Sequence, residues 1–356
     1  MKKIWEKRQT REGGIFILLI GLVMIRFLAA KDDFSYDYFA YIHNLRIIAD
    51  NRLGEVFSSE WLLFPYVNIP GGAAFELGFV VVAKVFLLVF VEPRIAYAAM
   101  AATSVGIRVY VMRRLGAHWL WIIVVGIYAI TLLEANAIRV GMAVSLVIYG
   151  LYRLHEKRPL SALLIIGFSM FMHLQALFFT FPLAFVWSLR KYIDRSRTRL
   201  IIVLLMLSLG TFLLLNSNVL TGNIKMTEYA NRNSISAGLS FTSISAIIFT
   251  LVALTSPRRT VRYEHGRLIW ISIVLAIIPS LIIFVTVTNI AAIGGRAWQF
   301  SFVILTSFIF TKWAGAEKRL NSTLILGTLA AISTLNVTLR FPLSNFFNFV
   351  LRNIEF

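Results

Sequence analysis

Long apolar runs separated by short charged breaks repeat along the chain from Ile15 to the C-terminus. Each run is roughly 16 to 22 residues long, which is about the length that crosses a bilayer as a helix. This pattern predicts an all-α polytopic membrane protein with roughly 11 to 12 transmembrane or re-entrant helices in a single integral domain over residues 1–356. We expect spans near residues 15–30, 74–91, 95–112, 118–133, 138–154, 159–173, 175–189, 200–216, 241–255, 268–288, 298–312 and 321–337.

The basic residues between the runs predict the orientation in the membrane. Short cytoplasmic loops carry an excess of Lys and Arg, so the basic breaks are expected on the cytoplasmic side, together with the lysine-rich N-terminus. These breaks are Arg113 with Arg114, Lys157 with Arg158, and the segments 190–199, 258–267 and 312–319. The first apolar run is interpreted as a retained span rather than a signal peptide, because Leu28 spoils the small-residue cleavage pattern.

This orientation places the remaining polar segments on the outer face. They are the loop 31–73, residues 134–139 and 173–175, the loop 217–240, residues 289–296 and an amphipathic tail over 338–356. Segment 74–91 does not fit a simple alternation of spans, since an odd number of crossings is required between Lys31 and the cytoplasmic Arg113. We therefore expect a re-entrant or interfacial element there.

The first outer loop contains an amphipathic pattern with several aromatic residues. Apolar side chains recur at helical spacing, which predicts a helix lying on the bilayer. The residues of this face are Phe34, Tyr38, Tyr41, Ile42, Leu45, Ile48 and Ala49. The aromatic residues fit two interpretations, a belt at the membrane interface or a surface on which sugars stack.

Composition supports the membrane class and excludes several others. Hydrophobic residues make up 58% of the chain and charged residues only 15%, and the mean hydropathy is +0.78. The net charge of +18 sits mostly in short loops, so it indicates membrane topology rather than nucleic-acid binding. Cysteine is absent and the five histidines are scattered, so we expect no thiolate chemistry, no metal site and no cofactor.

Two apolar segments joined by the basic turn 155–158 form the most informative local pattern. Arg139 lies at the start of the first segment and His173 at the end of the second, and the two arms are nearly equal in length. An antiparallel helical hairpin would therefore bring both side chains to one depth on the outer side. Ionisable residues at membrane depth are costly unless paired or hydrated, so this pair is a candidate functional site.

Several short motifs resemble the EpsG family of exopolysaccharide polymerases, which are relatives of the Wzy-type O-antigen polymerases. The resemblance covers roughly residues 30–300. Its motifs are Asp37-Tyr38-x-x-Tyr41, Phe75-Glu76-x-Gly78-Phe79, Asn136-x-x-Arg139-x-x-x-Ala143, Phe171-x-His173-x-x-Ala176-Leu177 and Gly295-Arg296-x-x-x-Phe300. The chain departs from the family where a usual Glu-Pro-Gly-Phe reads Glu76-Leu77-Gly78-Phe79, and where a frequent Asn-Gln before the arginine reads Asn136-Ala137-Ile138.

The resemblance implies a polysaccharide polymerase with a GT-C-like architecture in the bacterial inner membrane. Such an enzyme transfers a growing glycan from an undecaprenyl-pyrophosphate carrier onto a lipid-linked repeat unit at the outer, periplasmic face. The implied partners are undecaprenyl-pyrophosphate-linked oligosaccharide, membrane lipid and a chain-length regulator protein, with no nucleic acid.

The chemistry of this transfer suggests roles for particular residues. A departing pyrophosphate needs fixed positive charge, which arginine supplies with a planar fork of donors, so Arg139, Arg232 and Arg296 are expected to bind it. We expect metal-independent transfer, because no outer loop contains Asp-x-Asp. The acceptor hydroxyl also needs a base within hydrogen-bond reach. The candidate bases are His173, Asp37 and Glu76, and the candidate glycan-binding aromatics are Tyr38, Tyr41, Tyr229 and Trp298.

Other interpretations remain open at this stage. A lipid-linked oligosaccharide transporter or flippase would use the same buried charges for coupling, although no internal repeat is visible. An O-antigen ligase or terminal glycosyltransferase would use nearly the same donor site. Arg139 and Arg296 could instead extend to lipid headgroups, His173 could bond a neighbouring helix, and Glu134 could orient Arg139.

Overall fold

The computed structural model describes residues 2–28, 36–51, 61–63, 66–68, 74–129, 133–134, 137–188 and 300–308. The spans expected near 200–216, 241–255, 268–288 and 321–337, the loop 217–240 and the tail 338–356 lie outside these residues. The chain divides into two compact units, Met1–Arg114 with Ala129–Ala176, and Leu115–Tyr128 with Leu177–Phe356. The candidate site lies in the first unit.

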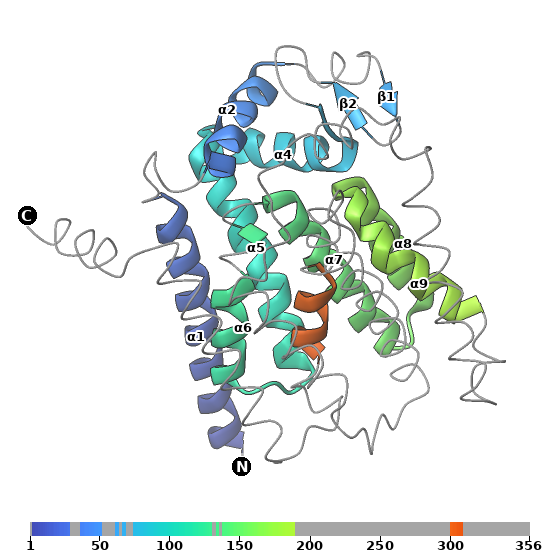
Figure 1. Cartoon of the computed structure of the whole chain (residues 1–356). Coiled ribbons are helices and arrows are strands. Elements are labelled where there is room, and N and C mark those ends of the chain that lie inside the picture. Colours follow the sequence, from blue (N-terminus) through green and yellow to red (C-terminus); the bar gives the residue numbers. More distant parts are fainter. Residues whose placement is uncertain are drawn as a thin grey trace, which may run out of the picture. The chain divides into compact units, whose positions relative to one another are not determined.

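Four helices form the body of the first unit (Figure 1). They are α1 (Lys2–Leu28), α5 (Pro93–Arg114), α7 (Ile138–His155) and α8 (Pro159–Met172). Helix α5 packs against α1 and α7, and α7 packs along α8. Pro159 occupies the first turn of α8, where its missing N–H has no intrahelical partner to lose, so the basic turn restarts directly as a helix.

A smaller group of elements lies across one end of these helices, and we call it the outer segment. It consists of α2 (Tyr36–Asp50), β1 (Trp61–Leu63), β2 (Tyr66–Asn68), β3 (Ala74–Glu76) and α4 (Leu77–Phe90). In Figure 1, α4 lies crosswise to α1 and α5, and it contacts both α5 and α8. At 14 residues, α4 is shorter than the roughly 20 residues of a bilayer-spanning helix.

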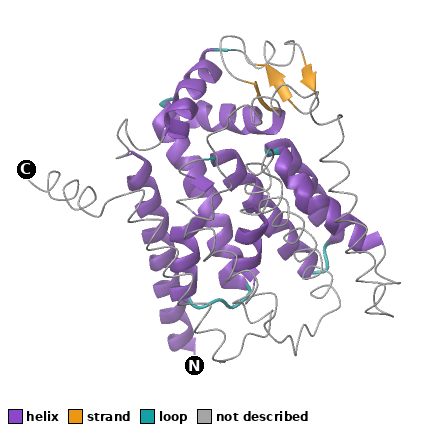
Figure 2. Ribbon diagram, in the orientation of Figure 1, coloured by secondary structure: helices purple, strands orange, loops and turns teal. Residues whose placement is uncertain are grey.

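The three strands form a small antiparallel sheet in the order β1-β2-β3 (Figure 2). The sequence analysis expected only helices and placed 74–76 inside an apolar span. Strands β2 and β3 pair Val67 with Phe75 and Tyr66 with Glu76, and Val67 and Phe75 are both buried. The sheet therefore ends at Glu76, where α4 begins.

Helix α2 has the apolar face that its sequence pattern predicts. Tyr38, Tyr41 and Leu45 are buried on this face, whereas His43 and Arg46 on the opposite face are exposed. The apolar face packs on α4 and α5. The aromatic residues of α2 are therefore part of a protein core.

Lys84 attaches α2 to α4. Its ammonium group donates hydrogen bonds to the carbonyl oxygens of Ile48, Ala49 and Asn51 at 2.7–2.8 Å. These carbonyls stand at the C-terminal end of α2, where the helix leaves acceptors unsatisfied and its dipole favours a cation. The lysine in an apolar run thus caps a neighbouring helix.

The second unit contains α9 (Leu177–Ser188), a helical segment over 300–308, and α6 (Trp119–Ala129). The last residue of α6 belongs to the first unit. The indole of Trp121 donates to the carbonyl of Thr306 at 3.2 Å, which joins α6 to this segment. Helix α6 is described as far as Ala129, and residues 130–132 of the expected span 118–133 lie outside the described residues.

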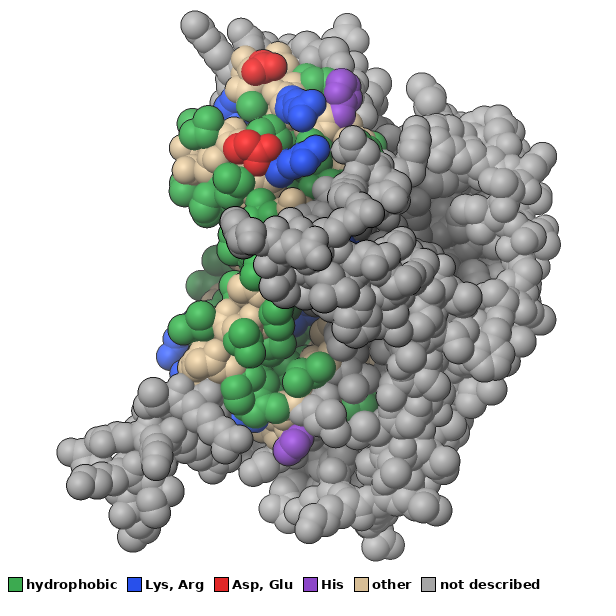
Figure 3. Space-filling model, turned by 90° about the vertical axis from the view of Figure 1, so that its left-hand side faces the viewer, with side chains coloured by type: hydrophobic (Ala, Val, Ile, Leu, Met, Phe, Trp, Pro, Cys, Tyr) green, Lys and Arg blue, Asp and Glu red, His purple; other side chains and the backbone are tan. Residues whose placement is uncertain are grey.

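Apolar surface is extensive on the described residues. Helix α5 is the one described helix that is long and apolar enough to cross a membrane, and Gly13–Leu28, α4 and α8 are shorter apolar helices. Exposed leucines line α8 at Leu160, Leu163 and Leu164. In Figure 3, hydrophobic side chains cover much of the described part of the face, and the acidic side chains in view lie toward its upper end beside basic ones.

Candidate functional site

Arg139 lies at the centre of a cluster drawn from separate elements of the first unit. It stands in the first turn of α7, and its Nη1 pairs with the carboxylate of Glu76 at the end of β3. Its Nε donates a hydrogen bond to the hydroxyl of Tyr41 on α2 at 2.9 Å. Two elements of the outer segment therefore hold the guanidinium of α7 in a fixed orientation.

Two aromatic rings complete the environment of Arg139. The centre of the guanidinium lies 4.7 Å from the Phe75 ring centroid and 5.7 Å from that of Tyr41. Such cation–π contacts stabilise a positive charge without neutralising it. The Arg139 side chain is 15% exposed, whereas that of Glu76 is only 1% exposed. The cation is thus the more accessible partner of this ion pair.

His173 follows α8 and faces the same carboxylate. Its Nε2 lies 3.9 Å from Glu76 Oε1, which also accepts a hydrogen bond from the backbone N–H of Leu174 at 3.4 Å. The Nδ1 atom accepts a hydrogen bond from the backbone N–H of Gln175 at 3.1 Å. A neutral imidazole with an accepting Nδ1 bears its proton on Nε2, so the N–H of His173 is directed toward Glu76.

Gly78 allows Glu76 and His173 to lie close together. A Cβ atom at Gly78 would lie 2.7 Å from the carbonyl carbon and oxygen of Phe171, so only glycine lets the start of α4 approach the end of α8 this closely. Phe171 is two residues before His173, and Gly78 is two residues after Glu76. The close backbone contact therefore brings the carboxylate and the imidazole together.

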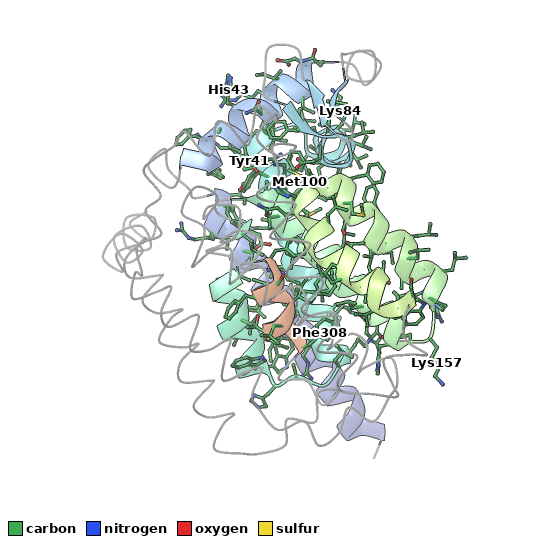
Figure 4. The ribbon with its side chains drawn as sticks, turned by 45° about the vertical axis from the view of Figure 1, so that its right-hand side comes forward. Tyr41, His43, Lys84, Met100, Lys157 and Phe308 are labelled. Carbon is green, nitrogen blue, oxygen red and sulfur yellow. The ribbon has the colours of Figure 1, made fainter. Side chains whose placement is uncertain are left out.

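The geometry agrees with the equal-arm hairpin expected from the sequence. Arg139 and His173 contact the same carboxylate at one end of the α7–α8 pair. The basic turn, with Lys157, lies at the opposite end, as Figure 4 shows. The site and the basic turn are therefore separated by the length of the hairpin.

Glu134 does not orient Arg139 by pairing with it directly, as one interpretation of the sequence allowed. Glu134 lies in a π-helical turn before α7, and its carboxylate pairs with Arg108 of α5. Five residues along the chain do not align Glu134 with Arg139, whereas Glu76 reaches the arginine from another element. Arg108 is a residue that the sequence analysis did not single out, and its signal was an isolated charge within the apolar run 95–112.

The structure places the other candidate residues differently. Tyr38 is buried, donates its hydroxyl proton to the carbonyl of Phe27 at 3.0 Å, and packs edge-on against Tyr97. Asp37 lies in the first turn of α2, and its side chain is outside the described residues. Arg232, Arg296, Tyr229 and Trp298 also lie outside them.

The cluster is suited to bind an anion beside an orienting carboxylate. Arg139 has the geometry for forked hydrogen bonds to phosphate oxygens, and Glu76 with Tyr41 restricts its rotamers. Among the described residues, no group of three or more His, Asp and Glu side chains could hold a metal ion. The Arg139 guanidinium supplies a fixed positive charge in the described part of the site.

Comparison with protein families matches the EpsG family over residues 14–350. Comparisons with curated proteins and with solved structures give no match. The family match spans almost the whole chain and includes every residue of the cluster. The chain therefore belongs to the EpsG family, a family of multi-pass membrane proteins linked to exopolysaccharide biosynthesis.

Proposed function

We propose that this protein is a polysaccharide polymerase of the bacterial inner membrane. It transfers a growing glycan from undecaprenyl pyrophosphate onto a lipid-linked repeat unit at the periplasmic face. The observation that supports this proposal is the accessible Arg139, fixed by Glu76 and Tyr41 at the end of the hairpin opposite the basic turn. Basic turns favour the cytoplasm, so this orientation puts the arginine at the outer leaflet.

In this proposal, Arg139 binds the pyrophosphate of the donor lipid. The acceptor hydroxyl attacks the anomeric carbon, the bond from that carbon to the phosphate oxygen breaks, and the pyrophosphate leaves with the electron pair. The negative charge that develops on the leaving oxygen is stabilised by fixed donors. Arg232 and Arg296, which the orientation predicted from the basic loops puts on the same face, would supply further positive charge. Arginine thus takes the part of a divalent cation.

The proton of the acceptor hydroxyl needs a separate acceptor. Glu76 is buried and already holds Arg139, so we assign it an orienting role. His173 can accept a proton on Nδ1 only if the hydrogen bond from Gln175 opens. Asp37, in the first turn of α2, is the alternative base. Tyr41 orients Arg139, while Tyr229 and Trp298 are proposed to contact sugars. Tyr38 is buried against Tyr97 and the backbone of α1, so we assign it a structural role.

The decisive experiment reconstitutes the purified protein in proteoliposomes with a lipid-linked repeat unit. A ladder of products supports a polymerase, a single shifted product indicates a ligase or terminal transferase, and movement of the lipid without bond formation indicates a flippase. The buried Arg108–Glu134 pair is the observation that favours the transporter alternative, because intramembrane charges often serve ion coupling.

Substitution of Arg139 tests the proposed site directly. Arg139→Ala is expected to lower polymerisation by about 10² to 10³, as for the removal of one fixed donor to a developing anion, and to leave single repeat units on the lipid. Arg153→Ala is the matched control, because Arg153 lies at the other end of α7 in an ion pair with Glu156. Long chains made at a normal rate by folded Arg139→Ala protein would refute the role of this arginine.

A further inference from the structure

A second Arg–Glu pair lies in the interior of the first unit, outside the cluster around Arg139. Arg108 Nη2 of α5 contacts Glu134 Oε1 in the π-helical turn before α7, and the two side chains are 5% and 0% exposed. Ser104 Oγ donates to the same carboxylate oxygen at 2.8 Å and lies 2.8 Å from Ser145 Oγ on α7. The pair thus joins α5, the turn and α7.

Stability alone does not account for this pair. Removing two charges from water costs several kcal/mol per ion, and well-packed apolar replacements of such pairs are often neutral or stabilising. Here Glu134 Oε2 and Arg108 Nη1 have no protein hydrogen-bond partner among the described residues. A costly pair of this kind is better explained by the geometry that it imposes on its neighbours.

Two structural connections lead from this pair to Arg139. The first is α7 itself, since a Cβ at Gly141 would overlap Glu134 Oε1, and Gly141 is two residues after Arg139. The carboxylate therefore packs directly against the first turns of α7. Ser145 Oγ, within 2.9 Å of the carbonyl oxygens of Ser104 and Gly141, extends this contact to α5.

The second connection passes through Tyr97 of α5. Its hydroxyl donates to the backbone carbonyl of Glu134 at 2.5 Å, and its ring centroid lies 6.1 Å from that of Tyr41. Tyr41 in turn accepts the hydrogen bond from Arg139 Nε. Tyr97 thus contacts both the turn before α7 and the aromatic partner of the arginine.

We propose that Arg108 and Glu134 are positioning residues that hold the first turns of α7, and with them the guanidinium of Arg139, in the orientation that binds the donor pyrophosphate. The role in donor binding rests on the proposed function. The positioning of Arg139 against Glu76 does not, and it can be tested separately.

The first test is a double-mutant cycle on the Arg139–Glu76 pair, measured as shifts in the unfolding temperature of the purified protein in detergent. The cycle combines Arg139→Met and Glu76→Gln, first in the wild-type background and then in the double variant Arg108→Met/Glu134→Gln. This background removes both buried charges at nearly constant volume, which avoids the orphaned charge that a single substitution would leave. In the Arg108→Met/Glu134→Gln background, we expect the non-additive part of the shift in unfolding temperature to be at most about half of its value in the wild-type background. An unchanged non-additivity would overturn the proposal.

The second test measures donor binding through product inhibition of polymerisation by undecaprenyl pyrophosphate. Orienting partners of a ligand-binding side chain typically contribute about tenfold or more, so we expect the inhibition constant and the KM for lipid-linked repeat unit to rise about tenfold in Arg108→Met/Glu134→Gln. Arg153→Met/Glu156→Gln, at the other end of α7, is the matched control and is expected to leave both constants unchanged. A lower kcat from less folded protein, with both constants unchanged, would indicate a purely structural pair.

A milder variant covers the case in which the double variant does not fold. Tyr97→Phe removes only the hydroxyl that bonds the Glu134 carbonyl and keeps the ring beside Tyr41. We expect it to raise the same constants about threefold, in line with roughly 0.5–1 kcal/mol for one hydrogen bond. Wild-type constants in folded Tyr97→Phe would contradict the proposal. Failure of the wild-type protein to polymerise would instead refute the proposed function and leave the double-mutant cycle as the test of positioning.

Discussion

The two Arg–Glu pairs of the first unit have the same chemistry and different surroundings. Arg108–Glu134 is enclosed by serine hydroxyls and the backbone of α7, and both side chains are almost completely buried. Arg139–Glu76 lies between aromatic rings beside His173, and its arginine is 15% exposed. A ligand can approach the second guanidinium but not the first. The difference in exposure suggests a structural role for Arg108–Glu134 and a ligand-binding role for Arg139–Glu76.

The largest effect is expected from breaking the enclosed pair. Arg108→Ala leaves Glu134 as a buried charge without its partner, which should lower the free energy of unfolding by about 3–5 kcal/mol. Thermal unfolding in detergent measures the loss. Arg139→Ala should destabilise the protein less, because the Glu76 carboxylate keeps the backbone N–H of Leu174 and the nearby imidazole of His173 as partners. Equal losses for the two substitutions would remove the distinction between the pairs.

The next effect comes from crowding the enclosed pair without removing a charge. Gly141→Ala places a methyl group against Glu134 Oε1, which is held by Arg108 and Ser104, so we expect a loss of about 1–3 kcal/mol in the free energy of unfolding. Gly167→Ala in α8 is the matched control. A Cβ there meets no atom within 4 Å, and the better helix propensity of alanine should stabilise by up to about 1 kcal/mol. Equal unfolding temperatures for the two variants would contradict this account.

A smaller effect, on ligand binding, is expected at the accessible pair Arg139–Glu76. Tyr41→Phe keeps the ring but removes the hydroxyl that accepts from Arg139 Nε, and we expect the inhibition constant for undecaprenyl pyrophosphate to rise about fivefold, equivalent to roughly 1 kcal/mol. Tyr38→Phe is its control, because the Tyr38 hydroxyl donates to the backbone carbonyl of Phe27 on α1. That variant should change stability and leave the constant unaltered. A raised inhibition constant in Tyr38→Phe, with a wild-type constant in Tyr41→Phe, would instead indicate that Tyr38 contacts the ligand.

The smallest effect is expected at an exposed Arg–Glu pair, Arg153–Glu156, in the turn between α7 and α8. A hydrogen bond from the Tyr152 hydroxyl, together with the charge of Arg153, lowers the pKa of Glu156 below its ordinary value. A lowered pKa means that the stabilisation is present above the unfolded-state pKa and is lost as the pH falls through the folded-state pKa. Exposed pairs contribute roughly 0–1 kcal/mol. Wild-type protein should therefore lose its small advantage in unfolding temperature over Glu156→Gln between pH 7 and acid pH, and a constant difference would contradict this.

The helices were largely predictable because their periodicity is local. The apolar runs locate α5, α7 and α8 within a few residues, and the spacing of aromatic and aliphatic residues locates α2. The small sheet was not predictable in the same way. Its strands are three residues long, too short for an alternating pattern to stand out from an apolar run.

The site was predictable only in part, because its contacts join distant parts of the chain. The hairpin argument brings Arg139 and His173 together, since both lie on adjacent helices. It could not show that Glu76, rather than the nearby Glu134, pairs with Arg139. That choice depends on how the outer segment packs against the hairpin. Likewise Arg108 and Lys84 are isolated charges in apolar runs, and their partners become visible only when the helices are assembled.

The three hydrogen bonds from Lys84 also constrain motion. They join the end of α2 to the middle of α4, while Tyr41 of α2 and Glu76, directly before α4, both hold Arg139. Sliding α2 past α4 would break all three of these partly buried bonds at once. Any movement that widened the space beside Arg139 would therefore have to displace α2 and α4 together.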